Sequence, residues 1–446
     1  MSIRRHSRHD QSPARRRPRR HRSASGGTAL LAVALTTATL TVAYAPLPAA
    51  RAQPPTTTTP FTTPDTDDCP NRTTPPPPID LSEVPRPGRT SPAPLPIPSP
   101  PIGGKNLGSC GVVRPAGAPQ APEGISATAY QVSDLDTGEV LIAKDPHGRY
   151  RPASTIKVLL AAVALRTLDL NKVVVGTQED ADVDGTRVGI GPGGRYTNRQ
   201  LFQALIMASG NDAAHAIAAQ LGGDDAAVAK MNDLAQRLQA KDTRAATPSG
   251  LDGPGMSISA YDLSVVFREA MSIPLFAELI HTEEVQFPGY GADPKNPADT
   301  EHPGYPIAND NLLLFNYDGA IGGKTGFTDD ARQTFVAAAQ RNGRRLVVTL
   351  LKADVRPYRP FEQAAKLLDY GFALPSGASV GELPEANTPK VATSTAALAT
   401  PPKPVAADVD DAGGRHDDLR VTLMVGGIVL VLFLLAGARQ IQQRRY

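Results

Sequence analysis

The distribution of proline constrains the fold of this chain more than any other feature of its sequence. Of 43 prolines in 446 residues, 20 lie between Gln53 and Pro122, in runs such as Pro75-Pro76-Pro77-Pro78. Proline has a fixed φ and no amide hydrogen to donate, so helix interiors and central strands exclude it. We therefore predict an extended, disordered linker over residues 53–123. Residues 124–375, about 250 in number, then form one folded domain.

Two apolar stretches outside that domain predict membrane targeting. Residues 28–47 follow an arginine-rich arm and precede Ala50-Arg51-Ala52, a small-x-small pattern typical of signal peptidase sites. Residues 1–52 are therefore predicted to be a basic arm with a signal peptide, or a signal anchor if cleavage fails. Residues 421–438 carry no charged residue and would make about 27 Å of helix, close to the hydrocarbon thickness of a bilayer. We predict a transmembrane helix there, reached through a second linker at 376–420.

The charges at the two ends predict the orientation of the chain. Residues 1–52 carry +9 and the tail 439–446 carries +3 of a total of +2, so the residues between carry −10. Arginines beside an apolar stretch mark its cytoplasmic side. We expect a cell-membrane protein with a cytoplasmic tail and an extracytoplasmic domain. The pI of 8.4 comes from the ends, so no nucleic-acid partner is predicted for the domain. The basic arm itself could bind nucleic acid, but its place before an apolar stretch favours targeting.

Both cysteines, Cys69 and Cys110, lie in the predicted linker. In an oxidising compartment we expect one disulfide between them in preference to free thiols. Two thiols without a nearby histidine do not form a metal site.

The pattern of the folded domain predicts an α+β fold. Residues 128–132 and 139–143 read as one β-hairpin, and residues 335–340 and 344–351, around Asn342-Gly343, as another. We expect their strands to share one antiparallel sheet with helices packed on it. Residues 172–184 read as strand-like. Helices are predicted to begin near Ser154, Thr197, Asn211, Asp224 and Ser259, and a last helix covers residues 361–372.

Three short patterns in this domain carry possible chemistry. Ser154 and Lys157 lie three residues apart at the start of an apolar helix, so they share one face, and a lysine of lowered pKa can take a hydroxyl proton. Ser209-Gly210-Asn211 follows 55 residues after Ser154, and Lys324-Thr325-Gly326 follows 115 residues after Ser209. Each pattern alone also fits a chance match, a helix cap or a polar turn.

Together and in this order, the patterns resemble the S-x-x-K, S-x-N and K-T-G set of penicillin-recognising serine enzymes. Residues 151–160, 209–214, 250–252 and 324–328 look like the D-alanyl-D-alanine carboxypeptidases, which are low-molecular-mass penicillin-binding proteins, and the likeness spans about residues 126–372. The resemblance implies a β-lactamase/transpeptidase-like domain with a helical subdomain. It also implies a peptidoglycan stem peptide ending in D-Ala-D-Ala as substrate, β-lactams as covalent inhibitors, and no metal or cofactor.

The resemblance implies three residues for the covalent chemistry. Ser154 would attack the penultimate D-Ala carbonyl and become acylated. Lys157, neutral because it is buried near other cations, would act as the base, and Ser209 would relay a proton to the leaving D-alanine.

It also implies five residues for substrate binding. Asn211 would hold the substrate backbone, while Lys324 and Thr325 would receive the terminal carboxylate. Gly326 would leave space for a substrate strand, and the backbone N–H of Phe327 would join that of Ser154 in an oxyanion hole.

Three other functions stay open at this point. Class A β-lactamases have Ser-Asp-Asn and a Glu-x-x-Leu-Asn element, whereas this chain has Ser-Gly-Asn and, in the comparable stretch, residues 247–252 without that element. An acyl-enzyme formed from penicillin should therefore persist. An endopeptidase would begin with the same acylation. A scaffold or sensor that has lost catalysis is the alternative outside enzymes.

Overall fold

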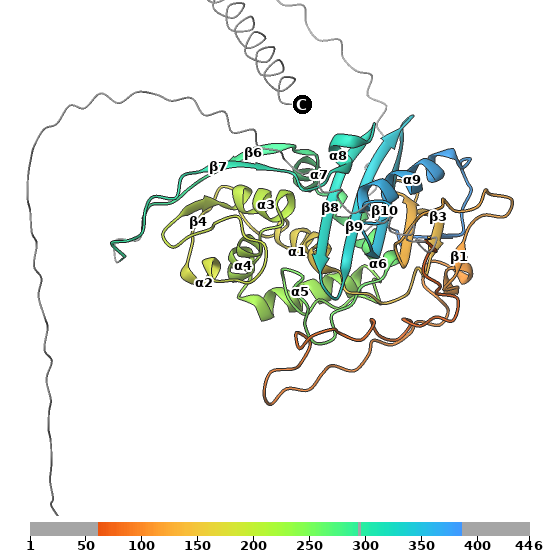
Figure 1. Cartoon of the computed structure of the whole chain (residues 1–446), viewed down its shortest axis with the longest axis horizontal. Helices are drawn as coiled ribbons and strands as arrows, with labels where there is room; N and C mark the ends of the chain where they lie inside the picture. The colour runs from red at the N-terminus through yellow and green to blue at the C-terminus, as the bar shows by residue number, and fades with distance from the viewer. Residues whose placement is uncertain (1–60, 293–295, 386–446) are drawn as a thin grey trace, which may run out of the picture. The chain divides into compact units, whose positions relative to one another are not determined.

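The structure is a computed structural model that describes residues 61–292 and 296–385 (Figure 1). Within this part of the chain, the centre is a seven-stranded antiparallel sheet of order β1-β3-β2-β10-β9-β8, with β11 paired to β3. Its strands are β1 (Val112–Val113), β2 (Ala129–Asp134), β3 (Glu139–Lys144), β8 (Ala320–Thr328), β9 (Arg332–Arg341), β10 (Arg344–Ala353) and β11 (Gly381–Glu382).

Both predicted hairpins are present, and they pair with each other within one sheet. β2 pairs with β3, and β9 pairs with β10 around Asn342 and Gly343. Both turn residues have positive φ, 51° and 79°, as a type I′ turn requires. β2 then pairs with β10, with Val132 opposite Val348, so the two ends of the domain meet at the centre of the sheet. The predicted antiparallel sheet and α+β class are confirmed.

Helices cover both faces of the sheet. Val347 and Leu351 of β10 belong to the core on the side of α1 (Lys157–Ala164) and α6 (Ala260–Met271). The alternate residue Val348 belongs to the core under α9 (Pro360–Ala373). Alternation along a strand sends neighbouring side chains to opposite faces, so a strand covered on both sides is apolar throughout.

The remaining elements form the helical part beside β8 and two further small sheets. The helices and turns are η2 (Ala153–Ile156), α2 (Gln178–Ala181), α3 (Asn198–Met207), α4 (Asn211–Gln220), α5 (Asp224–Arg237), α7 (Pro274–His281) and α8 (Leu313–Asn316). The small sheets pair β4 (Val173–Val175) with β5 (Arg195–Thr197) and β6 (Glu284–Phe287) with β7 (Tyr305–Ala308). The sequence did not predict α7, α8 or the β6–β7 hairpin.

Side-chain caps explain where several helices begin. Thr197 accepts a hydrogen bond from the backbone N–H of Gln200 and caps α3, as predicted. Ser259 caps α6 in the same way. The strand predicted over residues 172–184 is wrong beyond β4, because Thr177 and Asp180 form a second capping box that starts α2.

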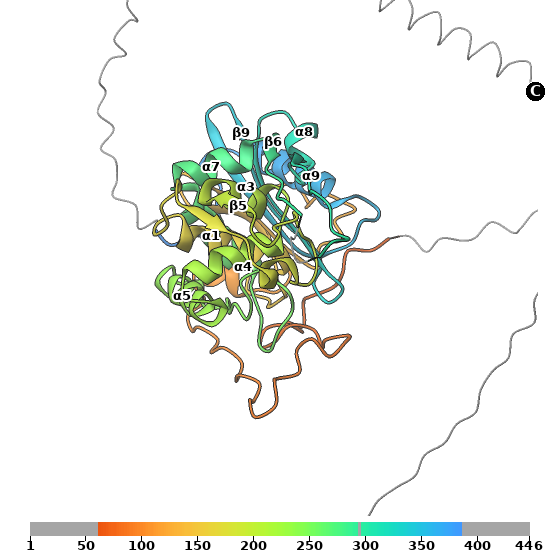
Figure 2. The same cartoon turned by 90° about the vertical axis from the view of Figure 1, so that its left-hand side faces the viewer.

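The disordered linker predicted over residues 53–123 is wrong for the part that the structure describes. Residues 61–123, here called the Pro-rich segment, pack against the domain (Figure 2). This segment contains η1 (Lys105–Gly108), pairs β1 with β3, and is closed by a disulfide between Cys69 and Cys110. Proline-rich backbone leaves its carbonyl groups without internal partners. Cationic side chains of the domain, described below, bind those carbonyls and hold the segment in place.

The second predicted linker begins later than expected. Residues 381–382 form β11 on the edge of the sheet, so the domain continues past residue 375. The predicted targeting arm 1–52, transmembrane helix 421–438 and tail 439–446 lie outside the described residues. Among the helices of residues 61–292 and 296–385, none is long and apolar enough to span a bilayer.

Candidate active site

Ser154 lies in a 3₁₀ turn, η2, that runs directly into α1. A 3₁₀ turn has about three residues per turn, so residues i and i+3 lie one above the other. This geometry places the Nζ of Lys157 2.8 Å from the Oγ of Ser154. The prediction that the two side chains share one face is confirmed, although the turn at the serine is tighter than an α-helix.

Three oxygen atoms surround the amine of Lys157. Besides Ser154 Oγ, its Nζ lies 2.7 Å from the Oδ1 of Asn211 and 2.6 Å from the backbone carbonyl oxygen of Ser249. Complete burial and the positive charge of Lys324 hold the pKa of Lys157 well below its usual value. A neutral amine has two hydrogens and one lone pair. The amide and carbonyl oxygens accept the two hydrogens, so the lone pair is left for the serine hydroxyl.

Ser209 and Asn211 lie where α3 passes into α4. Ser209 is buried and has a φ of 60°, a left-handed conformation that is uncommon for serine and occurs at functional sites. Asn211 begins α4, and its Nδ2 donates to the carbonyl oxygen of Asp184. The side chain of Asn211 thus positions the amine of Lys157, in addition to its predicted contact with substrate.

Lys324, Thr325 and Gly326 lie on β8, the edge strand of the sheet. Lys324 is buried, and its Nζ donates to the carbonyl oxygen of Thr325 at 2.8 Å. Burial lowers the pKa of Lys324 to about 8, while the negative charge of Asp310 opposes that shift. Phe327 follows and is 49% exposed, and the guanidinium of Arg332 lies 5.8 Å from the centroid of its ring.

Gly326 allows β8 to approach the nucleophile. A β-carbon added there would lie 2.8 Å from the backbone nitrogen of Ser154 and 3.0 Å from that of Thr155. Gly250 likewise allows its own loop to approach η2, since a β-carbon there would collide with the carbonyl of Ala153. The predicted role of Gly326, space for a substrate strand, is therefore accompanied by a contact within the protein itself.

The comparison with known families decides what this arrangement belongs to. A family model described as D-alanyl-D-alanine carboxypeptidase, peptidase family S11, matches residues 116–355, which contain all three motifs. The chain belongs to this carboxypeptidase family. The resemblance based on the motifs is confirmed, and the protein is a serine-type D-Ala-D-Ala carboxypeptidase.

Individual relatives of the carboxypeptidase agree with this assignment. The D-alanyl-D-alanine carboxypeptidase DacB2 of Mycobacterium tuberculosis is 48% identical over 275 residues, which are 61% of this chain and 90% of the relative. A crystal structure of a D-alanyl-D-alanine carboxypeptidase from the same organism matches 61% of this chain and all of its own, with 48% identity and a TM-score of 0.56. A Streptomyces DD-transpeptidase structure matches 57% of this chain and all of its own, with 28% identity and a TM-score of 0.53.

Two groups of the carboxypeptidase site were not predicted from the sequence. The carbonyl of Ser249 contacts Lys157, and every residue has a carbonyl, so no residue type could have indicated it. Asp310 influences the charges of Lys157 and Lys324 from the segment before α8. The available signal was its place between Asn309 and Asn311, because the spacing Asn309-x-Asn311-x-Leu313 ahead of Lys324 also resembles the family.

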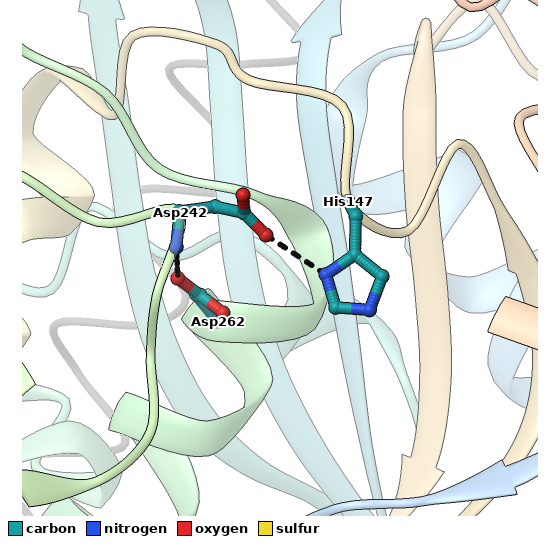
Figure 3. A group of neighbouring side chains, drawn as sticks. All are labelled: His147, Asp242 and Asp262. Atoms are coloured by element: carbon teal, nitrogen blue, oxygen red, sulfur yellow. Dashed lines mark hydrogen bonds and ion pairs between the residues drawn. The ribbon is translucent and has the colours of Figure 1, made fainter. Parts of the chain in front are cut away.

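One cluster of the carboxypeptidase, His147, Asp242 and Asp262, has the donor types of a metal site (Figure 3). His147 Nδ1 lies 2.8 Å from Asp242 Oδ2, and His147 Nε2 lies 3.0 Å from the carbonyl oxygen of Ile102. The other carboxylate oxygen of Asp242 accepts from Arg149, and Asp262 accepts the backbone N–H of Asp242. Both ring nitrogens of His147 face acceptors, so the ring donates from both as imidazolium. The atoms that could bind a metal are therefore engaged in hydrogen bonds within the protein, and we interpret the cluster as an ion pair.

Proposed function

We propose that this carboxypeptidase removes the terminal D-alanine from peptidoglycan stem pentapeptides through an acyl-enzyme on Ser154. The observation that carries the proposal is the buried amine of Lys157. It lies within hydrogen-bond distance of Ser154 Oγ, Asn211 Oδ1 and the carbonyl of Ser249. This arrangement fits a general base beside a nucleophile in a serine peptidase.

Acylation would use the residues of the helical side. Ser154 transfers its hydroxyl proton to the Nζ of Lys157 while its Oγ attacks the carbonyl carbon of the penultimate D-alanine. The tetrahedral intermediate collapses, the C–N bond breaks, and the leaving amine of D-alanine takes a proton through Ser209. Water then attacks the Ser154 ester, with the proton path reversed, and the shortened peptide leaves. Backbone N–H groups of Ser154 and Phe327 would stabilise the negative oxygen in both steps.

Substrate binding would use β8. Lys324, with a pKa of about 8, is mostly protonated at neutral pH and attracts the terminal carboxylate, to which Thr325 adds a hydroxyl. An edge strand has unpaired backbone groups, so the substrate backbone can lie antiparallel to β8.

The same site should be inhibited by β-lactams and should not destroy them. Residues 247–252, which stand where a class A β-lactamase has its Glu-x-x-Leu-Asn element, supply a carbonyl to Lys157 and pack Gly250 against Ala153. This stretch lacks the glutamate of that element, and its one carboxylate, Asp252, is hydrogen-bonded to Thr328, so the ester formed from a penicillin should be long-lived.

The deciding experiment measures D-alanine release from a diacyl-Lys-D-Ala-D-Ala peptide by the purified ectodomain and by Ser154→Ala. We expect release by the first and none by the second. Fast, steady nitrocefin turnover would indicate a β-lactamase instead. Cleavage of a cross-linked muropeptide in preference to the linear peptide would indicate an endopeptidase, and no release by either protein would indicate a scaffold.

We further propose that the enzyme acts outside the cytoplasm, anchored in the cell membrane by residues 421–438. Support comes from the two apolar stretches with arginines beside them and from the disulfide, a bond that persists in oxidising compartments. Fractionation of cells producing the chain with and without residues 421–438 tests the anchor. N-terminal sequencing tests the signal, because a mature protein that begins at Gln53 has a single anchor.

A further inference from the structure

The Pro-rich segment is attached to the strand-like stretch that leads into the nucleophile. Three cationic side chains stand there at every second position: His147 in a turn, and Arg149 and Arg151 in the extended chain on either side of Tyr150. Alternate residues of an extended chain point to the same side. All three bind groups of the Pro-rich segment, and Ser154 follows three residues after the last of them.

Arg149 and His147 bind backbone carbonyls of the segment. The guanidinium of Arg149 donates to the carbonyl oxygens of Thr73, Leu95 and Pro96 at 2.8, 2.6 and 2.9 Å. His147 donates to the carbonyl oxygen of Ile102 at 3.0 Å. Two stretches that are distant in the segment, at residue 73 and at residues 95–96, therefore bind the same arginine side chain.

Arg151 forms the attachment nearest to the active site. Its Nε donates to the Oε1 of Glu83 at 2.5 Å, and its NH1 donates to the carbonyl oxygen of Pro76 at 2.8 Å. The side chain of Arg151 is 2% exposed and that of Glu83 is 18% exposed. A charged pair so shielded from water keeps its geometry better than a surface pair.

The same part of the segment also contacts the turn at the end of β8, on the sheet side of the active site. The backbone N–H of Ile79 donates to the Oδ1 of Asp330 at 2.6 Å. Asp330 lies in the turn between β8 and β9, directly after the strand that carries Lys324 and Thr325. Residues 76–83 thus join the stretch before Ser154 to the turn at the end of β8.

The backbone between Arg151 and Ser154 needs such support. Ala153 has a φ of 47°, a left-handed conformation that costs free energy in a residue with a β-carbon and persists only where neighbours hold it. On the side of the sheet, Thr334 Oγ1 donates to the carbonyl oxygen of Pro152 at 2.7 Å. Before the turn in the chain, the support is Arg151, held by Glu83 and Pro76.

We propose that Glu83 and Arg151 are positioning residues of the carboxypeptidase, and that the Pro-rich segment is a working part of its active site. The pair holds the strained turn at Ala153, and through it the Oγ and backbone N–H of Ser154. This inference rests on the proposed role of Ser154 as nucleophile.

The disulfide strengthens this attachment. Cys69 and Cys110 are 41 residues apart, and residues 76–83 lie within the loop that they close. Closing a loop of this size removes conformational freedom from the detached state and thereby favours the attached one. Breaking the disulfide should have the same effect on acylation as breaking the Glu83–Arg151 pair.

The test measures acylation of the purified ectodomain by a fluorescent penicillin, together with kcat and KM for the peptide, at 25 °C. We expect Glu83→Ala to lower the acylation rate constant and kcat about tenfold, because small displacements of a nucleophile are costly, and to leave KM nearly unchanged. Glu83→Gln keeps an acceptor for Arg151 and should recover part of the rate. Asp68→Ala removes an exposed acid of the Pro-rich segment, just outside the disulfide loop, and serves as the matched control.

Each outcome decides between the alternatives. Glu83→Ala with a lower Tm but an unchanged acylation rate constant would make the segment a stabilising element only, and would overturn the inference. A rate lowered equally in Asp68→Ala would also overturn it. A Cys69→Ser/Cys110→Ser variant with a slower, otherwise normal acylation would support it, and one with an unchanged rate would contradict it. Labelling of Ser154→Ala would instead remove the proposed function on which the inference rests.

Discussion

Each wall of the active site buries one lysine, and the two walls give these lysines different electrostatic surroundings. The helical wall, η2 with α1 and α4, buries Lys157 among uncharged oxygens. Burial and the charge of Lys324 outweigh the opposing charges of Asp212 and Asp310, so the pKa of Lys157 falls well below its usual value. The sheet wall, β8, places Lys324 near Asp310, and its pKa falls only to about 8. Burial lowers the pKa of both lysines, and the neighbouring charges set the difference between them. The first lysine is suited to be a base and the second to be a cation.

The largest effect is expected from Lys157→Arg, which makes the helical wall carry a permanent charge. A guanidinium does not give up its proton, so it cannot take one from Ser154. We expect the acylation rate constant to fall by roughly 1,000-fold or more. Fluorescent-penicillin labelling measures it. Lys144→Arg, a buried lysine of β3, is the control and should retain activity. Activity in Lys157→Arg close to wild type would remove the lysine as base.

The contact between the two walls is the next target. Gly326→Ala places a methyl group 2.8 Å from the backbone nitrogen of Ser154, so β8 and η2 must separate. We expect acylation to slow by about 100-fold. Gly291→Ala is the control, because its added β-carbon meets open space. If the two variants react at the same rate, the close approach of β8 is not needed for catalysis.

Changing the sheet wall should affect binding more than chemistry. Lys324→Met removes the cation that we propose attracts the terminal carboxylate, so we expect KM for the peptide to rise by about tenfold or more. Removing that charge also raises the pKa of Lys157, so the rise of activity with pH should move to higher pH. In wild type, kcat/KM should fall above pH 8, where Lys324 loses its proton. Lys324→Arg stays charged and should lack this fall. A fall that persists in Lys324→Arg would assign it to another group.

The smallest effect is expected from Asp310→Asn. The negative charge of Asp310 raises the pKa of both lysines, so its removal lowers both. The bell-shaped dependence of kcat/KM on pH should move as a whole to lower pH, with a change of less than about threefold at neutral pH. Asp318→Asn, an exposed acid of the same region, is the control. A shift of one limb alone would show that Asp310 acts on a single lysine.

Local signals predicted much of the fold and of the site. Asn342-Gly343 indicated a hairpin, because few residues accept positive φ at both positions. Thr197 with Gln200, and Ser259, indicated helix starts. Such signals fail where a competing local pattern is overlooked, as with Thr177 and Asp180, which start a helix inside a predicted strand. The β6–β7 hairpin was missed because Pro303, Gly304 and Pro306 interrupt any strand pattern around β7.

The sequence by itself determined the reaction class, since its three motifs stand in the order found in this family of serine peptidases. It also determined the hairpins and caps, because the interactions that form them join residues only a few positions apart. The tertiary structure decided the charge of Lys157, which depends on burial and on Lys324, distant in the chain. It also decided that the Pro-rich segment has a defined structure against the domain. Proline excludes helix and central strand, yet it leaves carbonyls free to bind Arg149 and Arg151 once the domain has placed them.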